Sequence, residues 1–117
     1  MNTNGHSVGE HFENREPAVK ETYKAIVRVA RTLGPVKEDP KKTSIHLVRK
    51  TAFAGIATRK TGLTLTVKSE EDVSHPRIAR REQASANRWH LEIKLDAPEQ
   101  VDKQIAAWLK KAYELAG

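Results

Sequence analysis

The middle of this chain alternates apolar and polar residues with the period of a β-strand. The pattern is cleanest over 88–95 and recurs over 63–68. Two shorter segments, 43–49 and 52–57, alternate less regularly and lie close enough in sequence to form a hairpin. Because successive side chains of a strand point to opposite faces, these segments predict a sheet with one apolar and one polar face.

Segments with the period of an α-helix flank these strands. Apolar residues recur at steps of three and four in 17–33 and again in 98–115. Proline suits the first turn of a helix, and it stands at the start of both segments. Gly34 and Pro35 predict the end of the first helix, since glycine supplies a left-handed terminal position and proline cannot continue the helix.

Strands that follow one another without intervening helices favour an antiparallel sheet. We therefore predict an α+β fold in α-β-β-β-β-α order, with an antiparallel sheet of four or five strands and two long helices packed on one face. The fifth strand would be a short edge strand over 36–39, ended by Pro40. The segment 75–87 lacks regular alternation, and we expect it to be irregular or weakly helical.

The length of 117 residues corresponds to one domain. We assign 16–117 to that domain and 1–15 to a polar N-terminal segment. Ser7 and Glu10 have the spacing of a capping box, which predicts a short helical turn within this segment. No signal peptide is visible in the polar first residues, and the apolar runs are far shorter than the ~20 residues of a membrane helix. We therefore expect a cytoplasmic protein without a membrane partner.

Cysteine is absent from the sequence. Its absence excludes disulfides, thiolate zinc sites, iron–sulfur clusters and a cysteine nucleophile, and it fits a reducing compartment. The glycine-rich loops of nucleotide-binding proteins and the serine elbow of hydrolases are also missing. We therefore expect no cofactor, and we assign no catalytic residue and no metal ligand.

Positive charge is concentrated in the predicted strands. The net charge is +6, and 37–60 alone holds seven cations against two acids, while 77–94 holds five against two. Such clustering favours an anionic partner, either nucleic acid or a phosphorylated ligand, although it also fits a merely soluble surface. The aromatic fraction is only 5%, so the exposed stacking residues of a single-strand binder are not expected.

His46 is the residue most clearly placed on the polar face, because it stands between apolar Ile45 and Leu47. We expect it to be mostly neutral at pH 7, since neighbouring cations disfavour the imidazolium. The predicted function is a non-enzymatic binding module for an anionic partner, with an oligomeric state that the sequence does not define. The candidate ligand-binding residues are Lys41, Lys42, His46, Arg49, Lys50, Arg59, Lys60, Arg80, Arg81, Asn87, Arg88 and His90.

A metal-dependent or acid–base enzyme is the alternative function. It would be centred on His46, His90 and Glu92, which alternation places on the same polar face. Glu92 and Lys94 also have the spacing of a nuclease-like Glu-x-Lys motif. A metal site needs three or more ligands, so the alternative depends on whether the sheet brings the two histidines together.

Several segments together resemble one bacterial family, the domain of unknown function 5655. The resemblance covers 11–117, and the Lys-Lys-Thr-Ser-Ile-His-Leu sequence at 41–47 is its most specific part. The other segments that carry it are His11-Phe12, Leu33-Gly34-Pro35, Thr51 to Gly55, Ala84 to His90 and Trp108 to Gly117. The resemblance implies one small domain, with at most an accessory, nucleic-acid-related role, and it supplies no catalytic residues.

Overall fold

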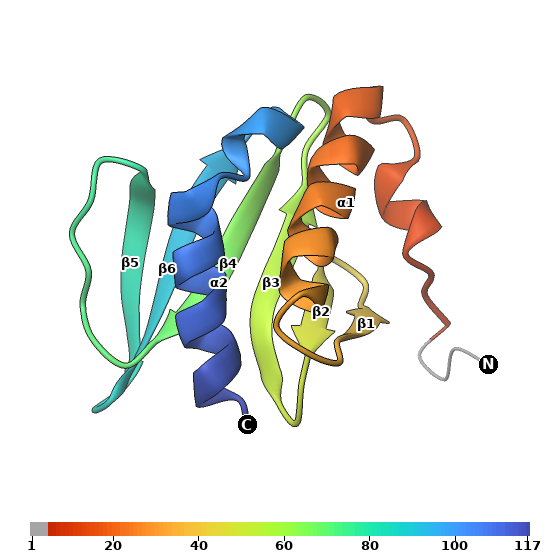
Figure 1. The fold of residues 1–117 in the computed structure, drawn as a ribbon. Coiled ribbons are helices and arrows are strands. Elements are labelled where there is room, and N and C mark those ends of the chain that lie inside the picture. Colours follow the sequence, from red (N-terminus) through yellow and green to blue (C-terminus); the bar gives the residue numbers. More distant parts are fainter. Residues whose placement is uncertain (1–4) are drawn as a thin grey trace.

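A computed structural model describes residues 5–117, in which two α-helices pack on one antiparallel sheet of six strands (Figure 1). The first four residues of the predicted N-terminal segment lie outside the described range. The helices are α1 (Pro17–Arg31) and α2 (Lys103–Leu115), and two short 3-10 turns, η1 (Gly9–Phe12) and η2 (Pro98–Gln100), accompany them. The strands are β1 (Lys37–Pro40), β2 (Ile45–Val48), β3 (Ala52–Thr58), β4 (Leu63–Ser69), β5 (Ile78–Ser85) and β6 (Arg88–Leu95).

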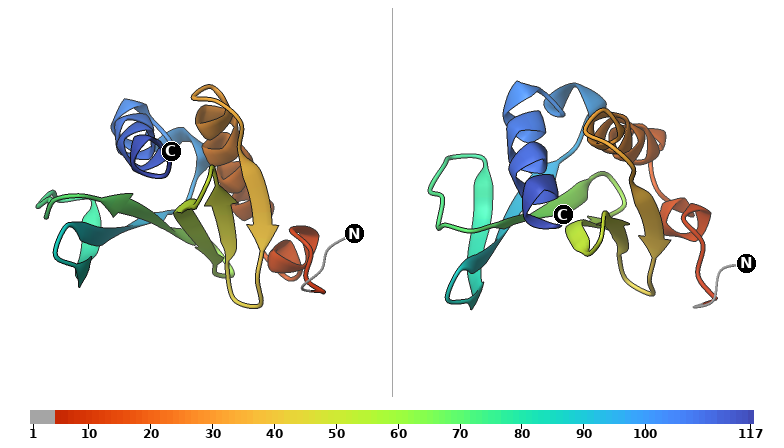
Figure 2. Two further views of the ribbon diagram at one scale, coloured as in Figure 1. Left: turned by 90° about the horizontal axis from the view of Figure 1, so that it is seen from below. Right: turned by 60° about the horizontal axis from the view of Figure 1, so that its bottom comes forward.

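The strands are arranged in the order β1-β2-β3-β4-β6-β5, and every neighbouring pair is antiparallel. The sheet is twisted, and both helices lie on the same side of it (Figure 2). Among residues 5–117, no helix lies on the other side of the sheet, which we call the helix-free face. The α+β class and the antiparallel pairing are thus as predicted, and the polar side chains of alternate strand positions face away from the helices.

The predicted number of strands was wrong because 78–85, expected to be irregular or weakly helical, forms β5. This strand pairs with β6 at the edge of the sheet, and nearly all of its residues are exposed. A strand that buries neither face needs no apolar alternation, so its sequence carries no period-2 signal. Register shifts within β5 weaken the signal further, because each one moves the following side chains to the opposite face.

The helices span 15 and 13 residues, so the prediction of two long helices was too generous for the second. α2 begins at Lys103 rather than at Pro98, because the chain first forms η2. The Asp102 carboxylate then accepts hydrogen bonds from the amides of Gln104 and Ile105, at 3.1 and 3.3 Å, and so caps the helix. In the residues described, neither helix is long and apolar enough to span a bilayer.

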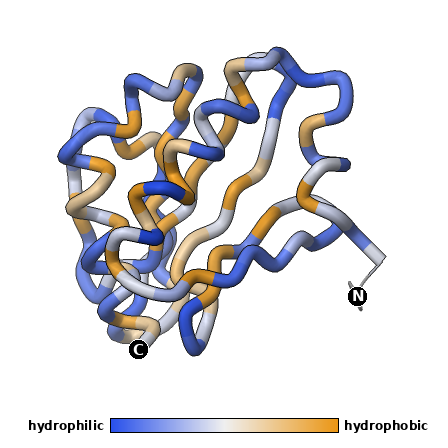
Figure 3. Tube along the Cα trace, turned by 45° about the vertical axis from the view of Figure 1, so that its right-hand side comes forward, coloured by the Kyte–Doolittle hydropathy of each residue, from blue (hydrophilic) through white to orange (hydrophobic). Residues whose placement is uncertain are grey.

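One apolar core fills the space between the helices and the sheet. Figure 3 shows hydrophobic positions recurring along the helices and inner strands, whereas the connecting loops are largely hydrophilic. Phe53 is fully buried, and its ring meets that of Tyr113 edge to face at 5.2 Å. Trp108 also belongs to the core and is 8% exposed, while Trp89 is only partly buried.

The N-terminal segment packs on one end of the sheet. Ser7 and Glu10 exchange the two hydrogen bonds of the predicted capping box, at 3.2 and 3.3 Å. His11 is buried, its Nε2 lies 2.8 Å from the carbonyl oxygen of Lys41, and its own carbonyl accepts from the Thr58 hydroxyl. These contacts fix the β1–β2 turn and the end of β3 on either side of η1.

Candidate functional site

The register of the sheet aligns polar residues in rows across its helix-free face. His46 on β2 pairs with Gly55 on β3, Gly55 with Thr66 on β4, and Thr66 with Glu92 on β6. In the adjacent row, Lys68 pairs with His90. Alternation had placed the polar members of these rows on one face, and the structure adds that β3 contributes no large side chain between them.

A hollow of about 260 Å³ opens on this face over β3. Its floor is apolar, because β3 presents small residues there, including Ala52, Gly55 and Ala57. Its rim is polar and is made by the neighbouring strands and the residue before β2. The rim side chains are Ser44, His46, Thr66, Lys68 and His90.

Gly55 is the residue that gives the hollow its depth. A Cβ atom built at this position would meet only one atom within 4 Å, the Cδ2 of His46 at 3.8 Å, which is an ordinary contact. The surrounding atoms therefore do not require glycine here. The register shift of the β2–β3 pair lies elsewhere, between Leu47 and Val48 of β2. Any larger side chain at position 55 would stand in the hollow.

The pKa of His46 is lowered from its ordinary value. The main cause is partial burial, which penalises the charged ring, and the positive charges of Lys41 and Lys68 add to it, while Asp39 opposes it. The direction agrees with the expectation from sequence, but burial rather than charge repulsion is the leading cause. Both Lys68 and His46 line the hollow above β3.

We expect the imidazole of His46 to titrate below the ordinary histidine pKa of about 6.5 in an NMR titration of its ring protons. Because the pKa of His46 is lower in the folded protein, the unfolded chain binds the imidazole proton more tightly. The stability that neutral His46 allows is therefore fully present above the unfolded pKa. It is lost as the pH falls from about 6.5 through the lower folded pKa. His46→Gln should flatten the dependence of stability on pH in this window and leave stability at pH 7 within about 1 kcal/mol. A ring that titrates above 6.5 would contradict the cause assigned here.

The predicted basic residues are not gathered at the hollow. The β2–β3 turn, with Arg49 and Lys50, and the β5–β6 turn, with Asn87 and Arg88, lie at one end of the sheet. The β1–β2 turn, with Lys41 and Lys42, and the β3–β4 turn, with Arg59 and Lys60, lie at the other end. Of the twelve candidates from sequence, His46 and His90 line the hollow.

Several of the predicted arginines are engaged within the fold. Arg49 lies on the helix side, where Nη1 donates to the carbonyl of Tyr113 at 3.0 Å and the guanidinium stands 4.4 Å from that ring. Arg59 donates to the Thr64 hydroxyl at 2.7 Å and so supports the β3–β4 turn. Side-chain alternation cannot reveal such contacts, because it assigns a face and not a partner.

The two arginines of β5 form ion pairs with nearby carboxylates. Arg80 lies 2.8 Å from Glu82 and 3.8 Å from Glu92, and Arg81 lies 3.2 Å from Asp72. Lys41 is similarly paired with Asp39 at 3.0 Å. These exposed pairs contribute little to stability, but they offset part of the positive charge that composition suggested was available to a ligand.

His46 and His90 lie on opposite sides of the hollow. Two strands, β3 and β4, separate them, which corresponds to about 14 Å at the usual spacing of neighbouring strands. Within residues 5–117, no group of three or more histidine, aspartate or glutamate side chains is arranged to hold a metal ion. The residues of the enzymatic alternative are therefore spread over the sheet, with Glu92 next to Arg80.

Sequence reasoning did not select Ser44, Thr66, Lys68 or the floor of the hollow as site residues. The alternation over 63–68 puts Thr66 and Lys68 on the polar face, but the clusters of charge favoured residues in the turns. The signal that could have located the hollow is the set of small residues in β3. Ala52, Gly55 and Ala57 leave this central strand without a bulky side chain on its helix-free face, whereas its large residues, Phe53 and Ile56, are buried.

Comparison with protein-family models matches residues 8–116 to the family described as Domain of unknown function (DUF5655). The match spans the sheet, both helices and every residue that lines the hollow. Neither the search of curated proteins nor the search of solved structures found a match.

Proposed function

The chain belongs to the DUF5655 family, and we propose that it is a binding module for a small anionic ligand, which it holds in the hollow over Gly55. The observation that carries the proposal is the combination of an apolar floor with a rim of one ammonium, two imidazoles and two hydroxyls. The matching ligand has a compact apolar body and a phosphate or carboxylate group. Such sites combine apolar walls with a few convergent polar groups.

Lys68 is the group best placed to bind the anionic end of the ligand. It forms no ion pair with the described residues, and no acidic side chain lines the hollow there. An ammonium between imidazoles and hydroxyls can give a phosphate or carboxylate several charge-assisted and neutral hydrogen bonds. The neutral form of His46, favoured by its lowered pKa, can either donate or accept.

The size and composition of this face favour a small ligand over a nucleic-acid strand. The hollow is short, and its lining contains no exposed aromatic ring for base stacking, since Phe53 is fully buried. Two of the candidate arginines, Arg80 and Arg81, are paired with Glu82, Glu92 and Asp72 at the edge of the sheet. A strand of nucleic acid across this face would meet few free cations.

Titration with phenyl phosphate, followed by backbone amide shifts in NMR, tests the proposal. Shifts should concentrate on β2, β3 and β4 around Gly55. Phenyl phosphate should bind more tightly than phenol, which lacks the anionic group, and more tightly than inorganic phosphate, which lacks the apolar ring. Lys68→Gln should weaken binding about tenfold or more, since a hydrogen bond to a charged group contributes about 1.5–3 kcal/mol. Binding should also weaken with salt.

Lys94→Gln is the matched control. Lys94 is exposed on the same face, at the far end of β6, and does not line the hollow. Its removal changes the net charge equally and should leave affinity within about twofold. Equal losses in the two variants, or shifts that map to the turns at the ends of the sheet, would show that general charge and not the hollow holds the probe.

A further inference from the structure

A second basic surface lies on the outer face of α1, on the other side of the molecule from the hollow. Lys20, Lys24, Arg28 and Arg31 recur at steps of four, four and three along this helix, and all four are exposed. These steps keep the side chains on one face. From Lys20 to Arg31 the row spans eleven residue steps, or about 16 Å at the rise of an α-helix.

The opposite face of α1 is fully used by the core. Val19, Tyr23, Ile26 and Ala30 are buried against the sheet and α2, so the basic row is the face that packing leaves to solvent. The interaction of cations with the helix dipole explains only part of the basic row. Cations in the last turn suit the negative end of a helix, but Lys20 and Lys24 stand in its first half.

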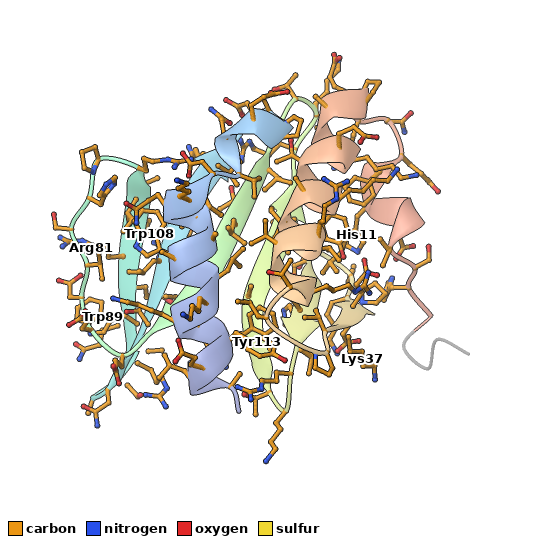
Figure 4. The ribbon with its side chains drawn as sticks, viewed as in Figure 1. His11, Lys37, Arg81, Trp89, Trp108 and Tyr113 are labelled. Atoms are coloured by element: carbon orange, nitrogen blue, oxygen red, sulfur yellow. The ribbon has the colours of Figure 1, made fainter. Side chains whose placement is uncertain are left out.

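The charge of the row is only partly neutralised. Lys24 lies 3.6 Å from Glu21, and Arg31 lies 3.2 Å from Glu38 on β1, whereas no described side chain forms an ion pair with Lys20 or Arg28. Glu21 is the single acid of the helix. Lys37 extends the positive surface at the start of β1, beyond the C-terminal end of α1 (Figure 4).

We propose that this basic row binds the phosphodiester backbone of a nucleic-acid duplex. A regular line of exposed cations provides phosphate contacts and counterion release, which is what sequence-independent duplex binding requires. A protein partner would need apolar or aromatic anchors at the centre of the interface. Insertion into a membrane surface would need the apolar face of the helix, which is buried.

Fluorescence anisotropy with a labelled 20-bp DNA duplex, and with an RNA duplex of the same sequence, tests this proposal. Four phosphate contacts give a slope of about −3.6 for log affinity against log salt, so affinity should fall about 150-fold from about 50 to 200 mM salt. In the triple variant Lys20→Gln/Lys24→Gln/Arg28→Gln the fall should be only about threefold to fourfold. Binding of both duplexes indicates backbone recognition, and binding of one of them identifies which duplex geometry the row fits.

The matched control removes three cations from α2, in the variant Lys103→Gln/Lys110→Gln/Lys111→Gln. These lysines are exposed, as are those of α1, but Asp102 and Glu114 accompany them. The control should keep the slope of the wild-type protein, and Lys20→Arg/Lys24→Arg should keep its affinity. The proposal is overturned if both triple variants lose affinity equally, or if neither duplex binds at about 25 mM salt. It is also overturned if anionic lipid vesicles or an acidic peptide bind the row more tightly than the duplexes. Lys68→Gln should leave duplex binding unchanged, so this result is independent of the hollow.

Discussion

Replacing Trp108 with alanine should lower the free energy of unfolding by about 3–5 kcal/mol, the largest effect expected for a single substitution of a large buried side chain. Trp108 lies on α2 and is 8% exposed. Its ring meets that of His75 edge to face at 5.2 Å, so it attaches the β4–β5 connection to the helix as well as filling the core. Alanine would remove both contacts and leave a cavity that the surrounding strands cannot close.

Urea denaturation followed by far-ultraviolet circular dichroism measures this loss without depending on tryptophan fluorescence. Trp89 is the natural control, because it is the other tryptophan of the chain and is only partly buried. Trp89→Ala should cost about 1 kcal/mol, the typical effect of a point substitution. A loss below about 1 kcal/mol for Trp108→Ala would contradict its place in the core.

Gly34→Ala should destabilise the domain by about 1–3 kcal/mol, the usual cost of forcing an extra group into a packed site. Gly34 has φ of +150°, a conformation that residues with a side chain rarely adopt. An added methyl group would also overlap the hydroxyl of Tyr113. That hydroxyl cannot withdraw easily, because it donates to the carbonyl of Pro35 at 3.0 Å and its ring is held by Phe53 and Arg49.

A double-mutant cycle separates the two causes. Tyr113→Phe removes the overlapping oxygen, so Gly34→Ala should cost less in the Tyr113→Phe background than in the wild-type protein. Gly9→Ala is the control for glycine replacement itself, since none of the described residues lies within 4 Å of a Cβ built at that position. It should change stability by only a few tenths of a kcal/mol. An unchanged cost of Gly34→Ala in the double variant would assign the whole effect to the backbone.

The parts of the fold that the sequence predicted are those that bury one face. β4 and β6 were found from alternation because their apolar residues pack under the helices, and both helices were found from their apolar stripes. β5 was missed because it buries neither face, and backbone hydrogen bonds to β6 hold it in place. The start of α2 was misplaced because η2 and the Asp102 cap interrupt a stripe that reads as continuous in the sequence.

The sequence predicted the polar face of the sheet but not the hollow on that face. Alternation correctly put His46, Lys68 and His90 on the side of the sheet without helices. It could not show that β3 lies between β2 and β4, nor that a central strand of small residues would leave a hollow there. The sequence also does not reveal which of the arginines, such as Arg49, are held by contacts within the fold itself.

The one-sided packing of the sheet separates the residues that hold the domain together from those available for chemistry. The helix side carries the core, whereas a side chain at position 55 would point to the helix-free face and meet only the ring of His46. A single change from glycine to a larger residue at position 55 would therefore fill the hollow without unfolding the domain, and the reverse change would open the hollow again. The residues that line this face can therefore change during evolution with little effect on the free energy of unfolding. Relatives that share the architecture then need not share an activity.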